Sequence, residues 1–334
     1  MSVKVVVIGG VVMDLEFWIS ALPKWKEAVQ ANKFHIDPGG KGLNQAVAAS
    51  RLGAEVSIIS AIGGNKTENE PDQFGLKILD VLHQENINND FVQVVEGEST
   101  AVTAVFVNDE AESSFIGWKS VTNNKRVICN LIEQSEKIIR NADALMITLE
   151  VPVEAIEKIL RIARHAKAIP RNHPGPLVLL NPAPPAEPHE RAFVIELMKY
   201  IDILVPNAWE ASQLLPLRQR EDPPNPEKLA SQLHHQLRVP RVCVTASDIG
   251  CFIATEGKVT QHSPFVSMVV DTVGGSDAFC AALVVGMAEG KKFFEAVDMA
   301  NAAGSLAVQT RGGYPSMPTR KQVNELLATH KTLK

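Results

Sequence analysis

Residues 270–279 read Val270-Asp271-Thr272-Val273-Gly274-Gly275-Ser276-Asp277-Ala278-Phe279, and no other part of the chain says as much about its architecture. Two glycines free the backbone of Cβ obstruction, and the apolar run that follows predicts a buried helix beginning near Ser276. The free N–H groups at a helix start attract anions. Asp277 is therefore either a cap for this helix or a base beside a phosphate oxygen, and the local chemistry leaves both alternatives open.

Outside this stretch, short apolar strand-like runs alternate with helix-like runs for most of the chain. This alternation is typical of an α/β protein with a largely parallel sheet. Helices are predicted over residues 44–52 and after Pro152. The sequence predicts strands at residues 3–8, 55–62, 143–149, 177–180, 201–205 and 241–245.

Two segments, residues 14–36 and 99–118, depart from the alternation because each reads as hairpin material with no helix between its strands. We expect them to form a small β-structure that projects from one single domain spanning residues 1–334 and serves as a lid. Lid strands expose edges and one apolar face, and pairing with a second copy of the chain covers both. The sequence therefore predicts a homodimer through the lid strands.

Composition excludes several classes of protein. The chain has 334 residues, and its 33 Lys and Arg against 38 Asp and Glu give a net charge of −5, which offers no electrostatic reason to expect nucleic acid or an anionic membrane as partner. The four cysteines form no C-x-x-C pair, which argues against a structural zinc or a redox dithiol. No apolar run approaches the roughly 18–20 residues of a membrane span, and Lys4 interrupts the first one, so we expect a cytoplasmic protein.

A phosphate group must be held without a Walker-type loop. The Gly-Lys pairs at Gly40, Gly257 and Gly290 are followed by Gly, Val or Lys and never by Ser or Thr. The dinucleotide fingerprint is also missing, because the first strand leads into Gly9-Gly10-Val11-Val12-Met13-Asp14 rather than into spaced glycines and a helix. The second observation argues against a nicotinamide-dependent dehydrogenase.

A second motif, Pro38-Gly39-Gly40-Lys41-Gly42-Leu43-Asn44-Gln45-Ala46, places glycines, a lysine and an amide at the start of a helix. It is either a glycine turn with an Asn cap or a polyol site in which Lys41 and Asn44 donate to ligand hydroxyls. Asp14 and Glu150, each at a strand end, are candidate acceptors for the same hydroxyls, because ligands gather at the carboxyl ends of strands in open α/β sheets.

Together, the two motifs resemble those of the ribokinase family of carbohydrate kinases, also called the phosphofructokinase-B family. The N-terminal motif, extended to Gly53, is most similar to the signature of the ribokinases. The resemblance continues through residues 97–100, 149–152, 181–184, 206–211 and 312–318, and so covers nearly the whole chain.

The resemblance implies a three-layer α/β/α fold with a central, mostly parallel sheet and a small β lid. It also implies an ATP-dependent kinase in which Asp277 takes the proton of a sugar hydroxyl. The amides of Gly274, Gly275 and Ser276 would then stabilise charge on the transferred phosphoryl group.

Further site residues follow from the resemblance alone. The sugar-binding positions are Asp14, Gly40, Lys41, Asn44 and Glu150. The positions for the nucleotide, its phosphates and Mg²⁺ are Asn207, Glu210, Thr245, Ser247, Gly250 and Asn301. The positions for a monovalent cation, with K⁺ as the expected ion, are Asp271, Val273, Ala307, Thr310, Gly312 and Ser316.

The chain departs from the family pattern at three of these places. Ser276 and Ser247 replace glycines, and Val12 replaces an asparagine that contacts the sugar. Trp118 and Lys119 are either lid contacts or exposed residues. Ribose, converted to ribose 5-phosphate, is the expected acceptor. The alternatives are a fructose-like ketose, a nucleoside, or a sugar- or nucleotide-binding regulatory protein with weak catalysis, and the presence of Asp277 favours the enzyme.

Overall fold

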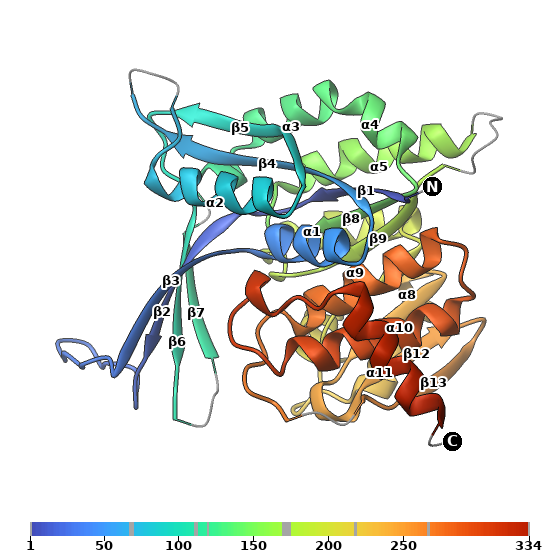
Figure 1. Ribbon diagram of the computed structural model, residues 1–334. Coiled ribbons are helices and arrows are strands. Elements are labelled where there is room, and N and C mark those ends of the chain that lie inside the picture. The colour runs from blue at the N-terminus through green and yellow to red at the C-terminus, as the bar shows by residue number, and fades with distance from the viewer. Residues whose placement is uncertain are drawn as a thin grey trace.

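Two β-sheets organise the chain (Figure 1). The computed structural model describes residues 2–66, 70–109, 113–118, 120–168, 175–216, 219–265 and 268–332. The large sheet lies between two layers of helices, and the small sheet projects away from one end of it. The predicted α/β class with a mostly parallel sheet is confirmed.

The large sheet has nine strands, and its central part is parallel from β5 to β11. An antiparallel pair, β12 and β13, closes one edge. In spatial order the strands are β13 (Lys258–His262), β12 (Cys251–Thr255), β11 (Arg241–Thr245), β10 (Ile203–Leu204), β9 (Leu177–Asn181), β8 (Ala144–Thr148), β1 (Lys4–Ile8), β4 (Glu55–Gly64) and β5 (Asn88–Glu96).

The apolar core is split by this sheet into two clusters, one on each face. Along β1, Val5 and Val7 join one cluster while Val6 and Ile8 join the other, because successive side chains of a strand point to opposite faces. A strand buried on both faces reads as a continuous apolar run, and this is why the sequence marks the central strands so clearly.

Each cluster is covered by its own helices, which completes the three predicted layers (Figure 1). One layer contains α1 (Lys41–Arg51), α2 (Gln73–Gln84), α9 (Gly275–Ala288), α10 (Phe293–Ala307) and α11 (Arg320–Thr332). The other contains α3 (Lys125–Gln134), α4 (Glu136–Asn141), α5 (Val153–Ala168), α6 (Arg191–Leu197), α7 (Ala208–Leu214) and α8 (Pro226–Leu237).

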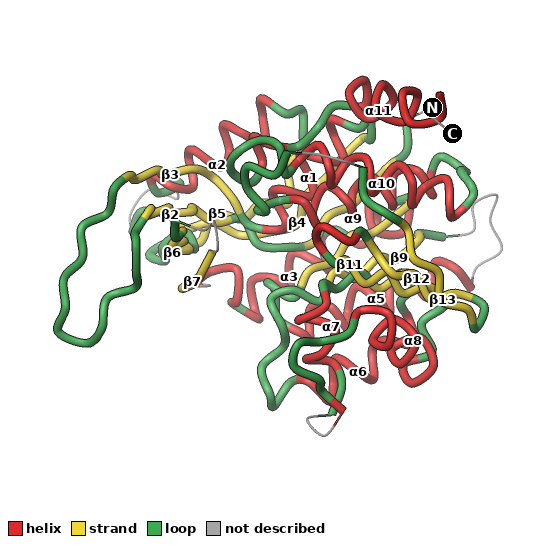
Figure 2. Tube along the Cα trace, turned by 90° about the horizontal axis from the view of Figure 1, so that it is seen from below, coloured by secondary structure: helices red, strands yellow, loops and turns green. Residues whose placement is uncertain are grey.

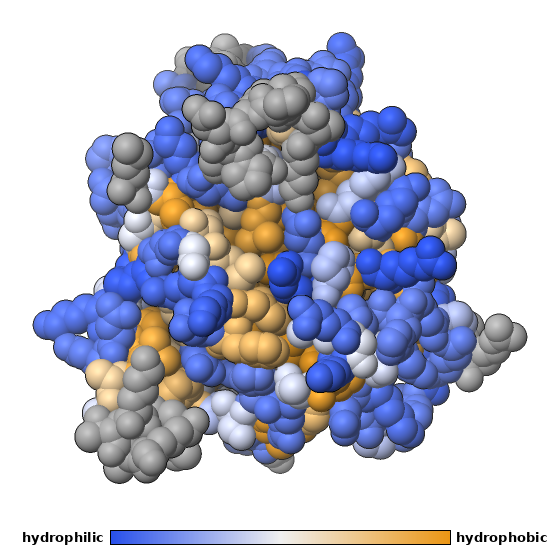
Figure 3. All heavy atoms as spheres, turned by 90° about the vertical axis from the view of Figure 1, so that its right-hand side faces the viewer, coloured by the Kyte–Doolittle hydropathy of each residue, from blue (hydrophilic) through white to orange (hydrophobic). Residues whose placement is uncertain are grey.

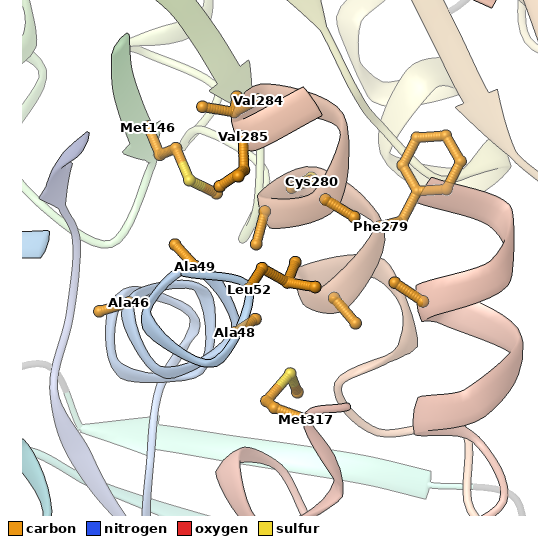
Figure 4. Packing of buried hydrophobic residues seen from close by; sticks show 14 of the residues in the cluster. Ala46, Ala48, Ala49, Leu52, Met146, Phe279, Cys280, Val284, Val285 and Met317 are labelled. Carbon is orange, nitrogen blue, oxygen red and sulfur yellow. The ribbon is translucent and has the colours of Figure 1, made fainter. Parts of the chain in front are cut away.

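The helices α1 and α9 pack against each other through small side chains, as Figure 4 shows. Ala48 and Leu52 of α1 lie toward α9, and Cys280 of α9 lies nearby. Small side chains let two helices approach closely and leave little freedom for sliding, since protein interiors are close-packed. The first turns of these two helices are therefore held at a fixed separation.

The small sheet has the strand order β3-β2-β6-β7 and draws its strands from the two segments that depart from the α/β alternation. Its strands are β3 (Lys33–Gly39), β2 (Val12–Trp18), β6 (Val102–Val107) and β7 (Ser113–Trp118). The pairs β2–β3 and β6–β7 are antiparallel, whereas β2 and β6 run parallel. The connection between β2 and β3 extends from this sheet as a long loop (Figure 2).

The register of the small sheet gives it two different faces. On the outer face, Phe17 of β2 contacts Phe34 of β3 on one side and Phe106 of β6 on the other. Ile116 lies in the same row as Leu15 and Ile36, so it shares that face. Asp14 and Glu16 alternate with these residues along β2 and therefore lie on the opposite face, which is lined by acids.

On the side of the molecule away from the small sheet, apolar residues form a central band between hydrophilic surfaces (Figure 3). None of the helices within the described ranges is both long enough and apolar enough to cross a membrane.

Candidate active site

Asp277 lies in the first turn of α9, as the sequence predicts, and is almost fully buried. The helix begins at Gly274, whose φ of +80° is the left-handed conformation that glycine adopts without steric cost. No side chain caps this helix, and the Asp277 carboxylate accepts hydrogen bonds from α1 instead. The cap is therefore excluded, and the carboxylate is directed toward the second motif.

The start of α1 supplies three donors to this carboxylate. Asn44 Nδ2 donates to Asp277 Oδ2 at 3.0 Å, Gln45 Nε2 donates to Oδ1 at 3.0 Å, and Lys41 Nζ lies 3.9 Å from Oδ1. Burial alone would lower the pKa of Lys41, but the carboxylates of Asp277, Glu210 and Glu150 outweigh it and raise that pKa, so the lysine stays charged. The two motifs, more than 200 residues apart in sequence, thus form one site.

Glu150 lies beside α1 but does not point into open space. Its Oε1 accepts from the Lys41 amide at 2.9 Å, and its Oε2 accepts from the amides of Gly10 and Gly42 at 2.8 and 3.1 Å. The Thr148 hydroxyl donates to the same Oε2 at 3.0 Å. Burial raises the pKa of Glu150, although the amides of Lys41 and Gly10 and the charge of Lys41 counteract that rise. The observed role of Glu150 is to tie the β1–β2 connection to the start of α1.

Asp14 on β2 has a carboxyl whose pKa is strongly raised. Burial, reinforced by the negative charges of Glu16, Glu150, Asp37 and Asp277, raises its pKa from 3.8 to about 8. Space for its carboxyl exists because residue 39, which pairs with Val12 at the end of β3, is a glycine whose Cβ would stand 1.8 Å from Asp14 Oδ2. A carboxyl this poorly solvated gains from any ligand hydroxyl that donates to it.

Ser276, which stands where the family has glycine, is accommodated without backbone strain. It lies in the first turn of α9 and is not among the residues with positive φ, whereas Gly274 is. Within the described residues its hydroxyl oxygen is buried with no hydrogen-bond partner. The amides of Gly274, Gly275 and Ser276 thus remain at a helix start where an anion is stabilised.

A cavity of about 690 Å³ opens beside the start of α9, with Gly275 and Ser276 in its wall. Phe265, Val269 and Phe279 contribute apolar surface to it. Five of the six residues expected at the nucleotide also line it: Asn207, Thr245, Ser247, Gly250 and Asn301. Its size and its mixture of apolar and polar lining are typical of a site for a molecule as large as a nucleotide.

The loop after β11 explains why glycine is favoured at position 247. Ser247 has a φ of +46°, a left-handed conformation that costs a non-glycine residue energy. Gly250 has a φ of +87°, and a Cβ there would stand 2.1 Å from the carbonyl oxygen of His262. The loop therefore needs glycine at 250 and tolerates serine at 247.

Glu210 is the sixth expected residue, and it lies in a capping box rather than in the cavity wall. Its amide donates to Asn207 Oδ1 at 2.7 Å, while its Oε2 accepts from the Asn207 amide at 2.9 Å. Glu210 therefore caps the start of α7 from its first turn. The carboxylate is nevertheless buried and close enough to Lys41 to raise the pKa of that lysine.

Two loops meet beside the start of α9 and carry the positions expected for the monovalent cation. Asp271 joins them, because its carboxylate accepts from the Val273 amide at 3.0 Å and from the Gly312 amide at 2.9 Å. The Ser316 hydroxyl donates to the Gly313 carbonyl at 2.8 Å, and the Ala307 carbonyl accepts from the Thr310 amide at 3.1 Å.

The second of these loops is held from outside by Arg51, the last residue of α1. Its Nη1 donates to the carbonyls of Tyr314, Pro315 and Met317 at 3.2, 3.2 and 2.7 Å. Its Nε and Nη2 donate to Glu85 at 3.0 and 2.6 Å. No group of three or more His, Cys, Asp or Glu side chains placed to hold a metal ion occurs among the described residues.

Other residues singled out from the sequence lie as follows. Val12 is buried at the start of β2 and offers no polar group. Trp118 ends β7 and is exposed, and Lys119 lies outside the described residues. No role was predicted from the sequence for Gln45 or Asn181, although both lie within the quoted motifs, and Gln45 contacts Asp277 directly.

Comparisons with known proteins agree with this geometry. The family model described as pfkB family carbohydrate kinase matches residues 2–320. The chain is 31% identical over 321 residues to the ribokinase of Haemophilus influenzae, covering 96% of this chain and 97% of that relative. It is 33% identical over 327 residues to the ribokinase of Bacillus subtilis, covering 97% and 99%. Among solved structures, it is similar to Arabidopsis thaliana ribokinase complexed with ribose and ATP, with a TM-score of 0.78, 28% identity and coverage of 98% and 99%.

Proposed function

The chain belongs to the pfkB family of carbohydrate kinases, and from this membership we propose that it transfers the γ-phosphoryl group of ATP to ribose, giving ribose 5-phosphate and ADP. The observation that carries the proposal is the position of Asp277. Its buried carboxylate accepts hydrogen bonds from Asn44 and Gln45 of α1, and Gly275 and Ser276 at the same helix start line the cavity. Ribokinases at about 30% identity over nearly the whole chain support ribose as the acceptor.

In the proposed reaction, the sugar hydroxyl gives its proton to Asp277 while its oxygen attacks the γ-phosphorus of ATP. The bond from that phosphorus to the β-γ bridging oxygen breaks, and ADP leaves. The amides of Gly274, Gly275 and Ser276 stabilise the charge on the phosphoryl oxygens, and Lys41 adds a positive charge nearby. General-base catalysis of this kind contributes about 10²- to 10⁴-fold to a rate.

The proposed sugar contacts come from β2 and α1. Asp14 accepts from ligand hydroxyls, and Lys41, Asn44 and the Gly40 backbone complete the pocket. Glu150 acts through its three amide partners, because these bonds fix where Gly40 and Lys41 stand. The small sheet, whose acidic face carries Asp14, is proposed as the lid of this pocket.

Two cations complete the proposal. Mg²⁺ prefers carboxylate oxygens together with phosphate and water, and Asn207 and Glu210 would hold it, since the capping box uses only Oε2 of Glu210. K⁺ accepts carbonyl and hydroxyl oxygens in place of its hydration shell. The loops joined by Asp271 present such oxygens, and Val273, Ala307, Thr310, Gly312 and Ser316 would hold the ion together with Asp271.

The proposal extends to assembly and location. The outer face of the small sheet leaves Ile116 67% and Trp118 55% exposed, which favours a homodimer that covers this face. All four cysteines are free thiols, which favours the reducing conditions of the cytoplasm.

The test is ATP consumption by the purified protein with Mg²⁺ and K⁺, across ribose, fructose, other simple sugars and nucleosides. We expect turnover with ribose and a loss of about 10²- to 10⁴-fold in kcat for Asp277→Asn, with ATP binding retained in calorimetry. Full turnover by Asp277→Asn would exclude Asp277 as the base. Faster turnover with a ketose or a nucleoside would correct the acceptor, and no turnover with any acceptor would favour a binding protein.

A further inference from the structure

Two buried amide side chains, Gln45 of α1 and Asn181 at the end of β9, link Asp277 to the backbone of the large sheet. Both are fully buried. Gln45 Nε2 donates to Asp277 Oδ1 at 3.0 Å and also to Asn181 Oδ1 at 3.3 Å. Asn181 Nδ2 donates to the carbonyl oxygen of Val205, directly after β10, at 2.7 Å. The order of the chain of hydrogen bonds is therefore Val205, Asn181, Gln45 and Asp277.

The Val205 carbonyl determines the direction of every hydrogen bond in this series. A backbone carbonyl can only accept, so Asn181 must turn its NH₂ group toward Val205 and its oxygen toward Gln45. Gln45 must then present its own NH₂ group to that oxygen. If the Gln45 amide were flipped, its oxygen would face the oxygens of Asn181 and Asp277, which is repulsive.

The two N–H groups of the Gln45 amide are both committed, one to Asn181 and one to Asp277. The same amide's oxygen is buried with no partner among the described residues. A buried polar atom without a partner destabilises the folded protein. Glutamine at position 45 carries this destabilising buried oxygen, which indicates that its NH₂ donor group is required.

The alternative is that Gln45 only fills space between α1 and the sheet. Its neighbours Ala46, Ala48 and Ala49 on α1 are buried, small and apolar (Figure 4), so an apolar residue at position 45 would suit this helix without leaving an oxygen unpartnered. The hydrogen bond to Asp277 is what an apolar residue would not supply.

We propose that Gln45 and Asn181 are positioning residues for the phosphoryl transfer, which hold the Asp277 carboxylate ionised and fixed in direction by a chain of hydrogen bonds anchored on the Val205 carbonyl. This inference rests on the proposed function of Asp277.

Asp277 also faces Lys41, whose Nζ lies 3.9 Å from Oδ1, and it interacts with the carboxyls of Asp14 and Glu150 and with the thiol of Cys280. These groups are the same in the parent and in the Gln45 variants. A hydrogen bond to the charged form of a carboxyl favours that form, so loss of the Gln45 donor favours the protonated base. The acidic limb of the pH profile of kcat then moves to higher pH.

The experiment compares the pH profile of kcat with ribose for the parent protein and three variants. Gln45→Glu is isosteric and places a second carboxylate about where the donor stood, so we expect the midpoint of the acidic limb to rise by at least about one pH unit. Gln45→Met removes the donor, and Asn181→Leu releases the Gln45 amide. Both should raise the midpoint by a smaller amount and lower kcat by about 10- to 100-fold, the loss expected for a misplaced catalytic group. Gln84→Glu, exposed at the end of α2, is the matched control and should leave the profile unchanged.

A purely structural role predicts a different result, in which Gln45→Glu and Gln45→Met lose thermal stability or kcat while the midpoint stays in place. That result would overturn the inference. Asn181→Leu removes the hydrogen bond that orients Gln45 and so acts on the same carboxylate through a different residue. The inference therefore stays testable if one Gln45 variant fails to fold.

The titration of Asp277 can also be followed without turnover, by ¹³C NMR of the carboxyl groups, with Asp277→Asn identifying the signal. An unchanged Asp277 titration in Gln45→Met would contradict the inference even for a protein that phosphorylates ribose. Failure of the proposed function is a separate result, seen as full activity of Asp277→Asn or as no turnover by the parent.

Discussion

Gly313 lies so close to Asn44 that a Cβ on residue 313 would stand 2.6 Å from Asn44 Oδ1. The loop that contains Gly313 is expected to hold the monovalent cation, and Asn44 is expected to contact the sugar. The loop therefore limits the space available to the Asn44 side chain. Gly313 has a φ of −72° and a ψ of −98°, a combination outside the main allowed regions, so both its backbone conformation and its contact with Asn44 favour glycine.

Gly313→Ala should therefore displace the Asn44 side chain, which also donates to Asp277. We expect kcat/KM for ribose to fall by about 10- to 100-fold, because small displacements of catalytic and binding groups have effects of this size. Steady-state kinetics measure the change. Gly117→Ala is the control, since a Cβ there meets nothing within 4 Å. Equal kinetics for the two variants would show that the close contact between Gly313 and Asn44 does not affect activity.

Asp14 predicts a specific dependence of stability on pH. Its folded-state pKa of about 8 lies above the ordinary 3.8, so the folded protein binds the proton more tightly than the unfolded chain does. Stability is then lost as the pH rises from about 4 to about 8. Asp14→Asn should be more stable than the parent by at least about 1 kcal/mol at pH 9, and the difference should shrink toward pH 5. Urea unfolding at both pH values measures it, with Asp80→Asn on the exposed side of α2 as control. A constant difference would contradict the shifted pKa.

The loop after β11 predicts opposite responses at two positions three residues apart. Ser247→Gly relieves a left-handed serine and should change the free energy of unfolding by no more than about +1 kcal/mol, since the flexibility of glycine offsets part of the gain. Gly250→Ala should destabilise by more than about 2 kcal/mol, because its Cβ would meet a backbone carbonyl. Denaturant unfolding of both proteins provides the comparison. Destabilisation by Ser247→Gly would show that the serine side chain has a role of its own.

Arg51 predicts a link between α1 and the monovalent cation. Arg51→Lys keeps the charge but cannot reproduce a fork that reaches three carbonyls and Glu85. We expect the K⁺ concentration for half-maximal activity to rise at least about tenfold, which corresponds to about 1.4 kcal/mol. A K⁺ titration of kcat measures it. Glu85→Gln keeps the carbonyl contacts and should have a smaller effect. If both variants respond equally, the ion pair rather than the loop contacts is responsible.

The small sheet predicts the oligomeric state. Ile116→Asp places a charge on the exposed apolar face, and we expect it to convert a homodimer into a monomer at micromolar concentration. Light scattering coupled to gel filtration distinguishes the two. Leu76→Asp, at an exposed apolar position on α2, should leave the dimer intact. A parent protein that is already monomeric would refute the predicted dimer.

The sequence predicted the large-sheet strands well where a strand is buried on both faces, because such a strand has a continuous apolar sequence. The strand predicted at 55–62 spans Glu55–Gly64, and that at 177–180 spans Leu177–Asn181. The polar edge strand β13, with the sequence KVTQH, lacks such a run and was not predicted. The strand order was also beyond the sequence, because it depends on which crossover each helix takes rather than on local pattern.

Within the candidate site, the sequence placed Asp277 at a helix start and Glu150 at a strand end, and both residues stand there. It did not reveal that Glu150 turns its oxygens to three backbone amides. Nor did it reveal the contact between Gln45 and Asn181, which are 136 residues apart. An amide in an Ala-rich helix start is a signal for Gln45, but its partner becomes visible only when α1 and β9 are placed side by side.

The carboxylate of Glu150 connects Gly10, just before β2, with Lys41 and Gly42 at the start of α1. These hydrogen bonds connect the start of the small sheet firmly to the start of α1, where the proposed sugar pocket lies. If the small sheet swings over a bound sugar, its hinge must lie farther out, beyond the first β2–β3 pair of Val12 and Gly39. Asp14, two residues past that pair, would then move with the small sheet while Lys41 and Asn44 stay in place. Closure would therefore bring the Asp14 carboxyl, as a hydrogen-bond acceptor, toward a sugar that Lys41 and Asn44 already hold.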